Sequence, residues 1–361
     1  MSLTSLSAGE VIHRLSEFDA IIDARSEAEF ALDHLPNALN WPTLDNAQRH
    51  AIGTMYKQVN PFEARKRGAA LAARNIAGHI EREALDKPRD WKPLAYCWRG
   101  GQRSGALALI LGQIGFRVTL LEGGYKAFRA AIVEDIVRRV QGLQFRVVCG
   151  PTGSGKTRLL HALKSQGAQV IDLEALACHR SSVLGALPGL AQPSQKRFDT
   201  LIWQALRQVD PQRPIYVESE SKKVGNVVVA PALMAAMRQS PCLNVQLSEH
   251  ERVALLLEDY AYFVNDPENL CERLEVLIPI RGRASVQRWQ ALARAGDLAE
   301  MVQELLQTHY DPAYAQSIVH NFEQFKNAKN IAPKDGSAGA MIDLASQIIS
   351  AEQMPDGPRS T

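Results

Sequence analysis

The chain has 361 residues, 46% of them hydrophobic, and its 41 Lys and Arg residues against 39 Asp and Glu residues leave a formal charge of +2. A chain of this size is expected to bury two separate cores. The near-neutral charge excludes a globally basic nucleic-acid-binding protein, so any RNA contact must be a local patch. Five dispersed cysteines do not make a disulfide scaffold or a zinc cluster, which suits a reducing compartment. We find no signal-peptide or membrane-spanning pattern, and we expect a cytoplasmic protein without membrane contact.

Strand-like segments alternate with helical ones along the first third of the chain. Apolar residues alternate or run together in FDAIID, PLAYCW and RVTLLEGG, at residues 18–23, 93–98 and 117–124, as they do in buried strands. Strands separated by helices are typical of a parallel α/β sheet. We therefore predict a small α/β domain over residues 1–128, followed by a helical linker over residues 129–142.

The same alternation resumes after the linker. QFRVVCG, AQVIDLE, RPIYVESES and PCLNVQLSE each predict a strand, and helical stretches lie between them. From Glu249 onward the pattern is mostly helical. We predict a second α/β domain with a helical C-terminal extension over residues 143–350, and a flexible polar tail over residues 351–361.

A single cysteine lies at the mouth of a glycine-rich loop in YCWRGGQRSGALALIL, residues 96–111. Thiolates rather than thiols are nucleophiles, so a catalytic cysteine needs a positive environment. Two glycines let backbone N–H groups turn inward, two arginines add charge, and a serine can cap the following helix so that its positive end faces the thiol. A buried strand-end cysteine is the alternative, but the loop favours catalysis. The candidate catalytic residues are Cys97, Arg99, Gly100, Gly101, Arg103 and Ser104.

Three segments together resemble a rhodanese domain: IIDARSEAEFALDHLPNALNWP, YCWRGGQRS and LLEGGYKAFR. The resemblance places Cys97 where rhodaneses carry sulfur or selenium as a persulfide or perselenide. Five residues separate Cys97 from Arg103, one more than is usual in single-domain rhodaneses, and this longer loop is similar to that of Cys-dependent phosphatases. Tyr96 stands where those phosphatases have a histidine. The resemblance therefore implies a loop sized for a phosphate-like donor on a rhodanese frame.

The segment VVCGPTGSGKTRLL contains the pattern G-x-x-x-x-G-K-[ST] between an apolar strand and an apolar helix, which is the context of a phosphate-binding P-loop. Glycines let the backbone wrap a phosphate chain, the helix N-terminus supplies N–H donors, the lysine adds a cation and the threonine can ligate Mg²⁺. The flanking strand and helix favour this interpretation over a chance glycine loop, so the second domain is predicted to be P-loop NTPase-like. The candidate phosphate-binding residues are Gly150, Gly153, Ser154, Gly155, Lys156 and Thr157.

Carboxylates follow two predicted strands of the second domain. Asp172 ends AQVID, while Glu218 and Glu220 end IYVESE, which occupies the place of a Walker B strand. These residues are candidates for Mg²⁺ binding or general-base catalysis, with helix caps and solvated strand ends as the alternative. His179 beside Cys178 has no partner at ligand spacing, so no tightly bound metal is expected.

Basic residues gather at a few places along the chain. Such clusters are most often solvated helix faces, although guanidinium groups near Trp289 could bind an RNA backbone and stack on bases. The candidate RNA contacts are Lys222, Lys223, Arg281, Arg283 and Arg288, with Arg138 and Arg139 as the next pair.

The order of the two domains, together with CWRGGQRS, GPTGSGKT, DLEALACHRSS and VESESKKVGNV, resembles the tRNA 2-selenouridine synthase family over nearly the whole chain. The resemblance implies an enzyme that replaces the sulfur of 2-thiouridine at the tRNA wobble position with selenium from selenophosphate. It implies that geranyl diphosphate first alkylates this sulfur, with its diphosphate on the P-loop, and that Cys97 carries selenium as a perselenide. The expected partners are tRNA and a supply of selenophosphate. No tightly bound cofactor is implied, and Mg²⁺ is a candidate ion at the P-loop.

Two other functions fit the motifs. In an ATP-dependent tRNA sulfurtransferase the P-loop would activate uracil by adenylation or phosphorylation, so nucleotide hydrolysis would accompany the reaction. In a non-catalytic regulatory fusion the cysteine loop would sense an anion, so replacing Cys97 by serine would leave activity intact. The first is the stronger alternative.

Overall fold

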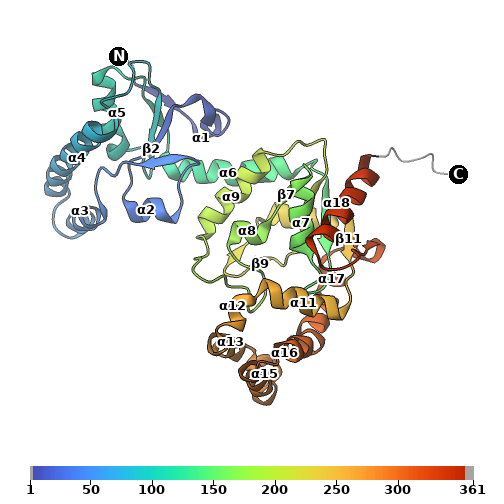
Figure 1. Cartoon of the computed structure of the whole chain (residues 1–361). Coiled ribbons are helices and arrows are strands. Elements are labelled where there is room, and N and C mark those ends of the chain that lie inside the picture. Colours follow the sequence, from blue (N-terminus) through green and yellow to red (C-terminus); the bar gives the residue numbers. More distant parts are fainter. Residues whose placement is uncertain (1–2, 354–361) are drawn as a thin grey trace. The chain divides into compact units, whose positions relative to one another are not determined.

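The computed structural model describes residues 3–353, which form two compact units (Figure 1). The first unit runs to Arg138 and also includes Pro193–Gln204, while the second contains Arg139–Gln192 and the described residues from Ala205 onward. The predicted division into residues 1–128, 129–142 and 143–350 is contiguous in sequence. The structure differs from it because a segment from the middle of the chain packs with the first unit.

The first unit is built on a five-stranded sheet in the order β1-β5-β4-β2-β3, and every neighbouring pair is parallel. The strands are β1 (Thr4–Leu6), β2 (Ala20–Asp23), β3 (Ala38–Asn40), β4 (Pro93–Tyr96) and β5 (Thr119–Leu121). Sequence patterns predict the three inner strands, whereas the edge strands β1 and β3 contain no fully buried residue and so give no pattern. Because β4 ends at Tyr96, Cys97 lies at the carboxyl edge of the sheet.

Helices connect and cover these strands. They are α1 (Ala8–Val11), α2 (Glu27–Leu32), α3 (Asn46–Gln58), α4 (Pro61–Glu83), α5 (Gln102–Ile114), α6 (Gly124–Val140) and most of α9 (Gln195–Arg207), with a 3₁₀ turn at Leu15–Glu17. Trp41, Trp91 and Leu107 pack with Ile22 in the core beside Cys97. The predicted linker is the C-terminal part of α6, a continuous helix that begins in the first unit.

The segment Pro193–Gln204 is fixed to the first unit by two buried carboxylates. Asp33 is fully buried and accepts hydrogen bonds from the Tyr125 hydroxyl (2.8 Å) and from Thr200 Oγ1 (2.9 Å). Burial raises the pKa of Asp33, although these two hydrogen bonds oppose the shift. Trp203 Nε1 donates to Asp135 at 2.8 Å. Polar groups of this segment therefore satisfy one oxygen of each carboxylate, whereas Asp33 Oδ1 has no hydrogen-bonding partner among the described residues.

The second unit contains a five-stranded parallel sheet in the order β12-β11-β6-β8-β7. Its strands are β6 (Phe145–Cys149), β7 (Gln169–Ile171), β8 (Ile215–Glu218), β11 (Cys242–Val245) and β12 (Lys329–Ile331), and a separate hairpin pairs β9 (Lys223–Val224) with β10 (Val227–Val228). The first four coincide with predicted strands. The P-loop follows the central strand β6 and the Glu218 carboxylate ends its neighbour β8, so both lie at one edge of the sheet.

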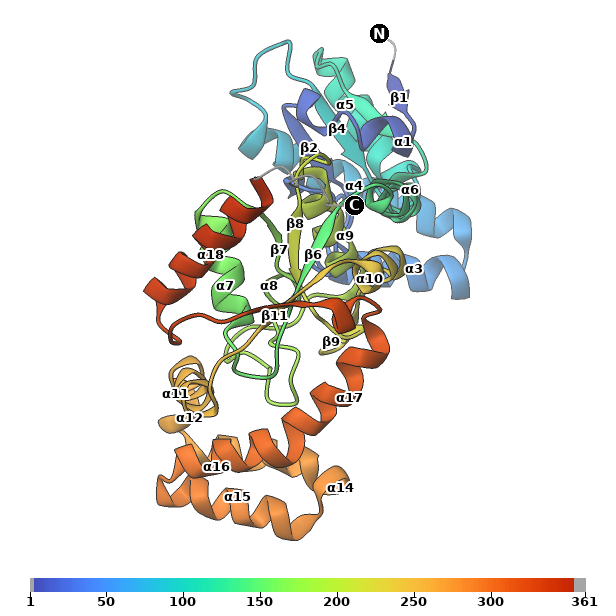
Figure 2. The same ribbon diagram turned by 90° about the vertical axis from the view of Figure 1, so that its right-hand side faces the viewer.

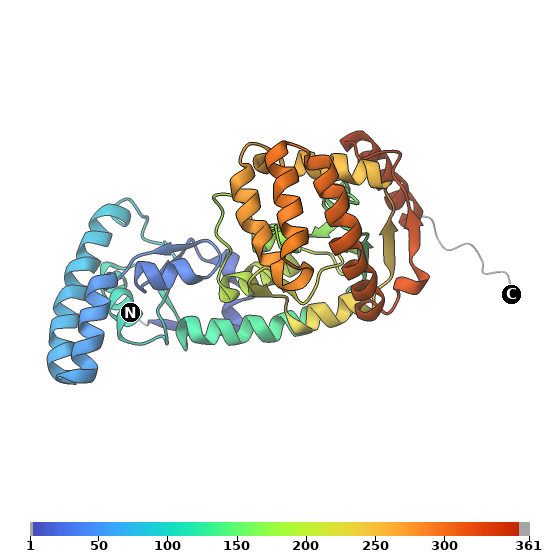
Figure 3. The same ribbon diagram turned by 90° about the horizontal axis from the view of Figure 1, so that it is seen from below.

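Helices cover both faces of this sheet and continue beyond it. They are α7 (Lys156–Ser165), α8 (Leu173–Ala177), α10 (Pro231–Gln239), α11 (Glu249–Asp259), α12 (Ala261–Val264), α13 (Pro267–Leu274), α14 (Ile278–Arg281), α15 (Arg283–Ala295), α16 (Leu298–Leu305), α17 (Asp311–Asn321) and α18 (Ala338–Gln353), with 3₁₀ turns at Glu275–Leu277 and Phe325–Asn327 and a π-helical turn at Leu306–Tyr310. Helices α7 and α18 lie side by side on one face (Figure 2). Helices α11 to α17 form the predicted helical extension (Figure 3).

These observations confirm the predicted α/β fold with a helical C-terminal extension. One boundary differs, because α18 continues to Gln353 and so includes the start of the predicted tail. The rest of that tail, residues 354–361, lies outside the described residues. Within residues 3–353 we find no helix with the length and apolar character that crossing a bilayer requires.

Candidate functional site

The Cys97 loop is fixed in place by the first turn of α6. Cys97 is 3% exposed at the end of β4. Its carbonyl accepts a hydrogen bond from the Tyr125 N–H (2.8 Å), and the Trp98 carbonyl accepts one from the Lys126 N–H (3.0 Å). Gly124 has φ +58°, and a Cβ there would lie 2.3 Å from the Cys97 carbonyl oxygen. Only glycine fits this contact, so the GG of LLEGGYK is part of the same site.

Ser104 acts on the cysteine rather than on the helix end. The predicted role for Ser104 is a cap of α5, but the residue at the cap is Gly101, without a side-chain hydrogen bond. Ser104 lies in the first turn of α5, is fully buried, and its hydroxyl donates to Cys97 Sγ at 3.2 Å. Ser104 therefore supplies a hydrogen-bond donor to the Cys97 sulfur instead of a helix cap.

The cations of the loop have different environments. Arg103 donates to both Glu29 carboxylate oxygens, at 2.6 and 3.4 Å, so part of its charge is balanced there. Burial acts to raise the pKa of Glu29, but the hydrogen bonds and charge of Arg103 lower it overall. Arg99 is exposed, and within residues 3–353 its side chain has no assigned partner. Lys196 of α9 places Nζ 5.3 Å from the centre of the Trp98 ring. Sequence reasoning missed Lys196 because no local signal connects it with the loop.

The P-loop places its six candidate residues around one turn between β6 and α7. Lys156 Nζ donates to the carbonyls of Gly150 (2.7 Å) and Pro151 (3.2 Å). Gly155 has φ +85°, and a Cβ there would lie 2.4 Å from Met341 Cε. Ser154 is fully buried, and its hydroxyl has no hydrogen-bonding partner among the described residues. The loop therefore contains a lysine, a buried hydroxyl and a helix N-terminus, which are the kinds of group that an anion site uses.

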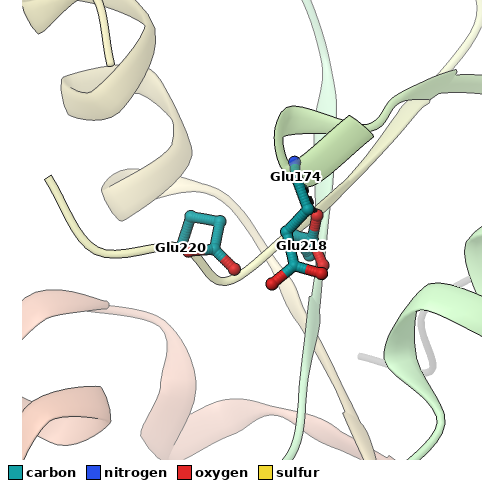
Figure 4. A group of neighbouring side chains, drawn as sticks. All are labelled: Glu174, Glu218 and Glu220. Atoms are coloured by element: carbon teal, nitrogen blue, oxygen red, sulfur yellow. Dashed lines mark hydrogen bonds between the residues drawn. The ribbon is translucent and has the colours of Figure 1, made fainter. Parts of the chain in front are cut away.

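Three carboxylates meet beside this loop (Figure 4). Glu174 of α8, Glu218 at the end of β8 and Glu220 each place an oxygen within 4.8 Å of the others. Thr157 Oγ1 donates to Glu174 Oε2 at 3.4 Å, and the Glu174 N–H donates to Glu218 Oε1 at 3.3 Å. Glu218 Oε2 is buried without a hydrogen-bonding partner among the described residues.

Proximity and burial make this cluster hard to ionise. Burial raises the pKa of Glu218 well above its usual range, and the charges of Glu174 and Glu220 raise it further. Burial and the charge of Glu220 raise the pKa of Glu174 to about 8, against the lowering effect of Lys156. Burial also raises the pKa of Glu220, although a hydrogen bond from Ser181 opposes the shift. A divalent cation would balance these charges, and oxygen ligands next to Thr157 suit Mg²⁺.

One predicted carboxylate has a different role. Asp172 caps α8 by accepting a hydrogen bond from the Ala175 N–H (2.8 Å), and its other oxygen lies 3.1 Å from His161 Nε2. Its partners are therefore those of a helix cap, and Glu174 stands in the cluster instead. The DLE sequence contains the signal that sequence reasoning missed: a carboxylate two residues beyond a cap lies on the first turn of the helix, at the same sheet edge.

The predicted RNA contacts do not share one environment. Lys222, Lys223 and Arg283 are exposed, whereas Arg288 pairs with Glu300 and Glu304, and Arg281 donates to His309. Trp289 is 2% exposed within the core of the helical extension and so cannot stack on a base. Of the next pair, Arg138 contacts Asp135 and His13.

An apolar cavity of about 70 Å³ lies in the second unit, between the P-loop and the helical extension. Its wall includes Thr152 of the P-loop and the apolar residues Leu256, Tyr260, Phe263, Leu270, Met301, Leu305 and Tyr310. Arg252 of α11 joins these parts because Nε donates to the Thr152 carbonyl (2.9 Å) and its terminal nitrogens bind Asp311 (2.6 and 3.0 Å). A phosphate chain on the P-loop would therefore have an apolar space at one end.

Comparison with known proteins identifies both units. The family model of the tRNA 2-selenouridine synthase AAA domain matches residues 143–276, and the model of the rhodanese-like domain matches residues 7–131. The tRNA 2-selenouridine synthase of Marinobacter nauticus is 31% identical over 330 residues, covering 81% of this chain and 87% of that protein. The enzyme of the same name from Cupriavidus necator is 33% identical over 329 residues, covering 82% and 87%. That of Nitrosomonas europaea is 33% identical over 267 residues, covering 72% and 67%.

Proposed function

Because the chain belongs to the tRNA 2-selenouridine synthase family, we propose that it converts 2-thiouridine at the tRNA wobble position into 2-selenouridine, with S-geranylation as the first step. The enzyme class and the tRNA product follow from the family. The geranyl intermediate, the selenium carrier and the residue roles are our proposals. Action on tRNA would place the enzyme in the cytoplasm.

The observation that carries the geranylation step is the apolar cavity that begins at Thr152. Geranyl diphosphate has an apolar chain beyond its phosphates, which matches the apolar wall of this cavity, whereas a nucleotide has a polar ribose at that position. In the proposed step the thiocarbonyl sulfur attacks C1 of the geranyl group, the C–O bond breaks, and diphosphate leaves with the N3 proton of the uridine. Lys156 and the N-terminus of α7 would stabilise the charge that develops on the leaving diphosphate.

The cavity must enlarge to hold the chain. A dry cavity of roughly 150 Å³ accommodates a benzene molecule, and a ten-carbon chain is longer than that, whereas the present volume is about 70 Å³. Unbranched Met301 in the wall is adaptable because its side chain has three rotatable bonds. We therefore expect the chain to enter by displacing such side chains, and to become better ordered by the contacts it gains.

For the second step we propose that Cys97 carries selenium. Loading Cys97 from selenophosphate releases phosphate. Because a perselenide, S–Se⁻, is two electrons more oxidised than a thiolate plus selenide, this step also needs a disulfide as the electron acceptor. Attack of the perselenide on C2 expels geranylthiol and leaves a selenenylsulfide between C2 and Cys97. Two thiols then release 2-selenouridine and Cys97 and re-form the disulfide, so atoms and electrons balance over the cycle.

The loop residues would act on this chemistry electrostatically. Backbone N–H groups around Gly100 and Gly101, with Arg99 and Arg103, would hold the phosphate part of the donor, and Ser104 would stabilise the Cys97 thiolate by the hydrogen bond described above. In the second unit Thr157, Glu174 and Glu218 would hold Mg²⁺, which supplies charge neutralisation for a bound diphosphate. The buried oxygen of Glu218 that has no hydrogen-bonding partner among the described residues supports this assignment.

The experiment separates the two steps by nucleoside mass analysis of 2-thiouridine-containing tRNA incubated with each donor. Cys97→Ser should abolish selenouridine formation and leave geranylation unchanged, whereas Lys156→Ala should abolish geranylation. Met301→Trp, which fills the cavity, should raise the KM for geranyl diphosphate while inorganic diphosphate still inhibits as in the wild type. Thermal melting of each variant checks that it is folded.

The same incubation tests the ATP-dependent sulfurtransferase. That function requires ATP consumption in proportion to product, with ADP or AMP appearing at a one-to-one yield. Stoichiometric nucleotide cleavage, or geranylation that survives Lys156→Ala, would overturn the assignment of the P-loop to geranyl diphosphate.

A further inference from the structure

Helices α3 and α4 form an antiparallel hairpin that is inserted between β3 and β4 of the first unit (Figures 1 and 3). The two helices pack on each other along their length, with Gly68 of α4 against Ile52 of α3 and with Ala64 buried. The turn between them, together with the adjoining helix ends, forms the hairpin tip, which we define as residues 56–67. None of the sequence motifs discussed above includes the hairpin tip.

The hairpin tip exposes three large apolar side chains within seven residues. Val59 is 75% exposed, Phe62 is 64% exposed and Tyr56 is 47% exposed. Single exposed apolar residues are ordinary on protein surfaces, but a group of this kind indicates a site of interaction. These side chains contribute little to the core, so core packing does not explain why three of them lie at this turn.

Cations surround these apolar groups. The hairpin tip contains Lys57, Arg65, Lys66 and Arg67 against the single acidic residue Glu63. Lys66 pairs with Glu63 at 2.6 Å, whereas within residues 3–353 the structure gives no ion-pair partner to Lys57, Arg65 or Arg67. The Arg65 guanidinium lies 6.0 Å from the Tyr56 ring centre, and Lys66 Nζ lies 5.0 Å from that of Phe62. Positive charge and exposed aromatic rings therefore share one small surface.

The local sequence holds the hairpin tip in a defined shape. Asn60 caps α4 by accepting hydrogen bonds from the Phe62 N–H (2.8 Å) and the Glu63 N–H (3.2 Å). Pro61 occupies the first position of the helix, where its fixed φ is already suitable. The exposed rings are therefore presented on a capped helix start, which lowers the entropy lost when a partner binds.

We propose that the hairpin tip is a docking surface for the tRNA substrate. Lys57, Arg65 and Arg67 supply charges that can replace the counterions of backbone phosphates, and the rings of Tyr56 and Phe62 can stack on unpaired bases. Four cations against one carboxylate give the hairpin tip the sign of charge that a phosphate backbone requires. This inference rests on tRNA being the substrate, and not on the geranyl or perselenide chemistry.

The test measures binding of an unthiolated tRNA transcript by fluorescence anisotropy at salt concentrations between about 50 and 200 mM. The variant Lys57→Gln, Arg65→Gln, Arg67→Gln removes the three cations of the proposal and keeps good helix formers at exposed positions. Each phosphate contact contributes about 0.7–0.9 to the slope of log affinity against log salt. If three contacts are lost, the decrease in tRNA affinity between the lowest and the highest salt concentration should be roughly 20- to 40-fold smaller for the variant than for the wild type. Phe62→Ala should weaken binding about 5- to 150-fold without changing the slope.

The matched control removes three cations from the segment between the C-terminal end of α4 and the start of β4. Lys87→Gln, Arg89→Gln, Lys92→Gln lowers the charge of the same unit equally, before the start of β4 and away from the Cys97 edge, and it should keep the wild-type slope. A wild-type slope in the tip variant, or an equal loss in the control, would overturn the proposal. So would a change from dimer to monomer on light scattering with unchanged tRNA binding, which would assign the hairpin tip to self-association.

The readout also separates this proposal from the proposed function. The transcript has no thio group, and neither geranyl diphosphate nor selenophosphate is present. A Cys97→Ser or Lys156→Ala variant that makes no product but binds tRNA normally would leave the docking proposal intact. An active tip variant with unchanged tRNA binding would refute the docking proposal and leave the proposed function unaffected.

Discussion

Replacing Glu174 by glutamine should stabilise the second unit at neutral and alkaline pH in the absence of Mg²⁺. In the wild type the pKa of Glu174 is raised from 4.5 to about 8 by burial and by the charge of Glu220. A carboxyl group with a raised pKa favours the folded state below pH 4.5, and this contribution is lost as pH rises through about 8. Glutamine has nearly the same shape and cannot ionise, so Glu174→Gln should not show this loss.

The size of the effect follows from the shift. pH 7 is 2.5 units above the ordinary pKa of 4.5 for this group. At about 1.36 kcal/mol per unit, keeping the Glu174 carboxyl protonated in the folded state therefore costs about 3 kcal/mol of unfolding free energy at pH 7. Part of the Glu174 side chain remains accessible to water, so solvent screening should reduce the measured effect to about 1–2 kcal/mol. For a domain of this size, that corresponds to a rise in Tm of roughly 2–8 °C.

The assay is thermal unfolding of the wild type and Glu174→Gln at pH 5 and pH 8, in EDTA and in Mg²⁺. In EDTA the variant should melt higher at pH 8, and the difference should shrink toward pH 5. Mg²⁺ should raise the Tm of the wild type more than that of the variant because the variant loses one ligand. Glu272→Gln, an exposed change in the same unit, controls for net charge. A variant that melts no higher than the wild type at pH 8 in EDTA, or a pH-independent difference, would refute the reasoning.

Two further substitutions test the Cys97 loop. Ser104→Ala removes the 3.2 Å hydrogen bond to Cys97 Sγ. Because a hydrogen bond to a charged group contributes about 1.5–3 kcal/mol, selenium transfer should slow about 10- to 150-fold while geranylation stays unchanged. An unaltered transfer rate would count against the role of Ser104. Gly124→Ala places a Cβ 2.3 Å from the Cys97 carbonyl oxygen at φ +58° and should destabilise the first unit by more than about 2 kcal/mol, measured by urea unfolding. Gly112→Ala in α5, with open space around it, should cause no such loss, and equal stability of the two variants would contradict the close contact.

Contiguous motifs could be predicted from the sequence, and contacts between distant segments could not. The P-loop and the Cys97 loop each follow a buried strand and precede a helix. The order of strand, loop and helix along the chain is therefore enough to predict that each loop lies at the carboxyl edge of its sheet. Ser104 is different because its position in the first helical turn could be inferred, but not which way its hydroxyl points. Only the packing of α5 against β4 determines that it reaches Cys97 Sγ.

The carboxylate cluster is a second case in which the sequence does not reveal how side chains are oriented. Asp172 and Glu174 are both acidic and stand two residues apart, and sequence patterns treat them alike. The capping hydrogen bond at Asp172 orients its side chain toward the helix start, which leaves Glu174 to face Thr157 and Glu218. Similarly, nothing in the composition of the Arg288 region reveals that glutamates from α16 neutralise it.

The assignment of Pro193–Gln204 to the first unit has a consequence for synthesis of the protein. The ribosome must add 66 residues after Arg138 before Gln204 exists, which takes roughly 3–13 s at about 5–20 residues per second. During that interval the nascent first unit lacks the Thr200 hydroxyl for Asp33 and the Trp203 indole for Asp135. The rhodanese-like unit therefore completes its fold only after translation of the P-loop unit is under way, and a gene fragment that stops at residue 142 encodes a protein with these two carboxylates left without those donors.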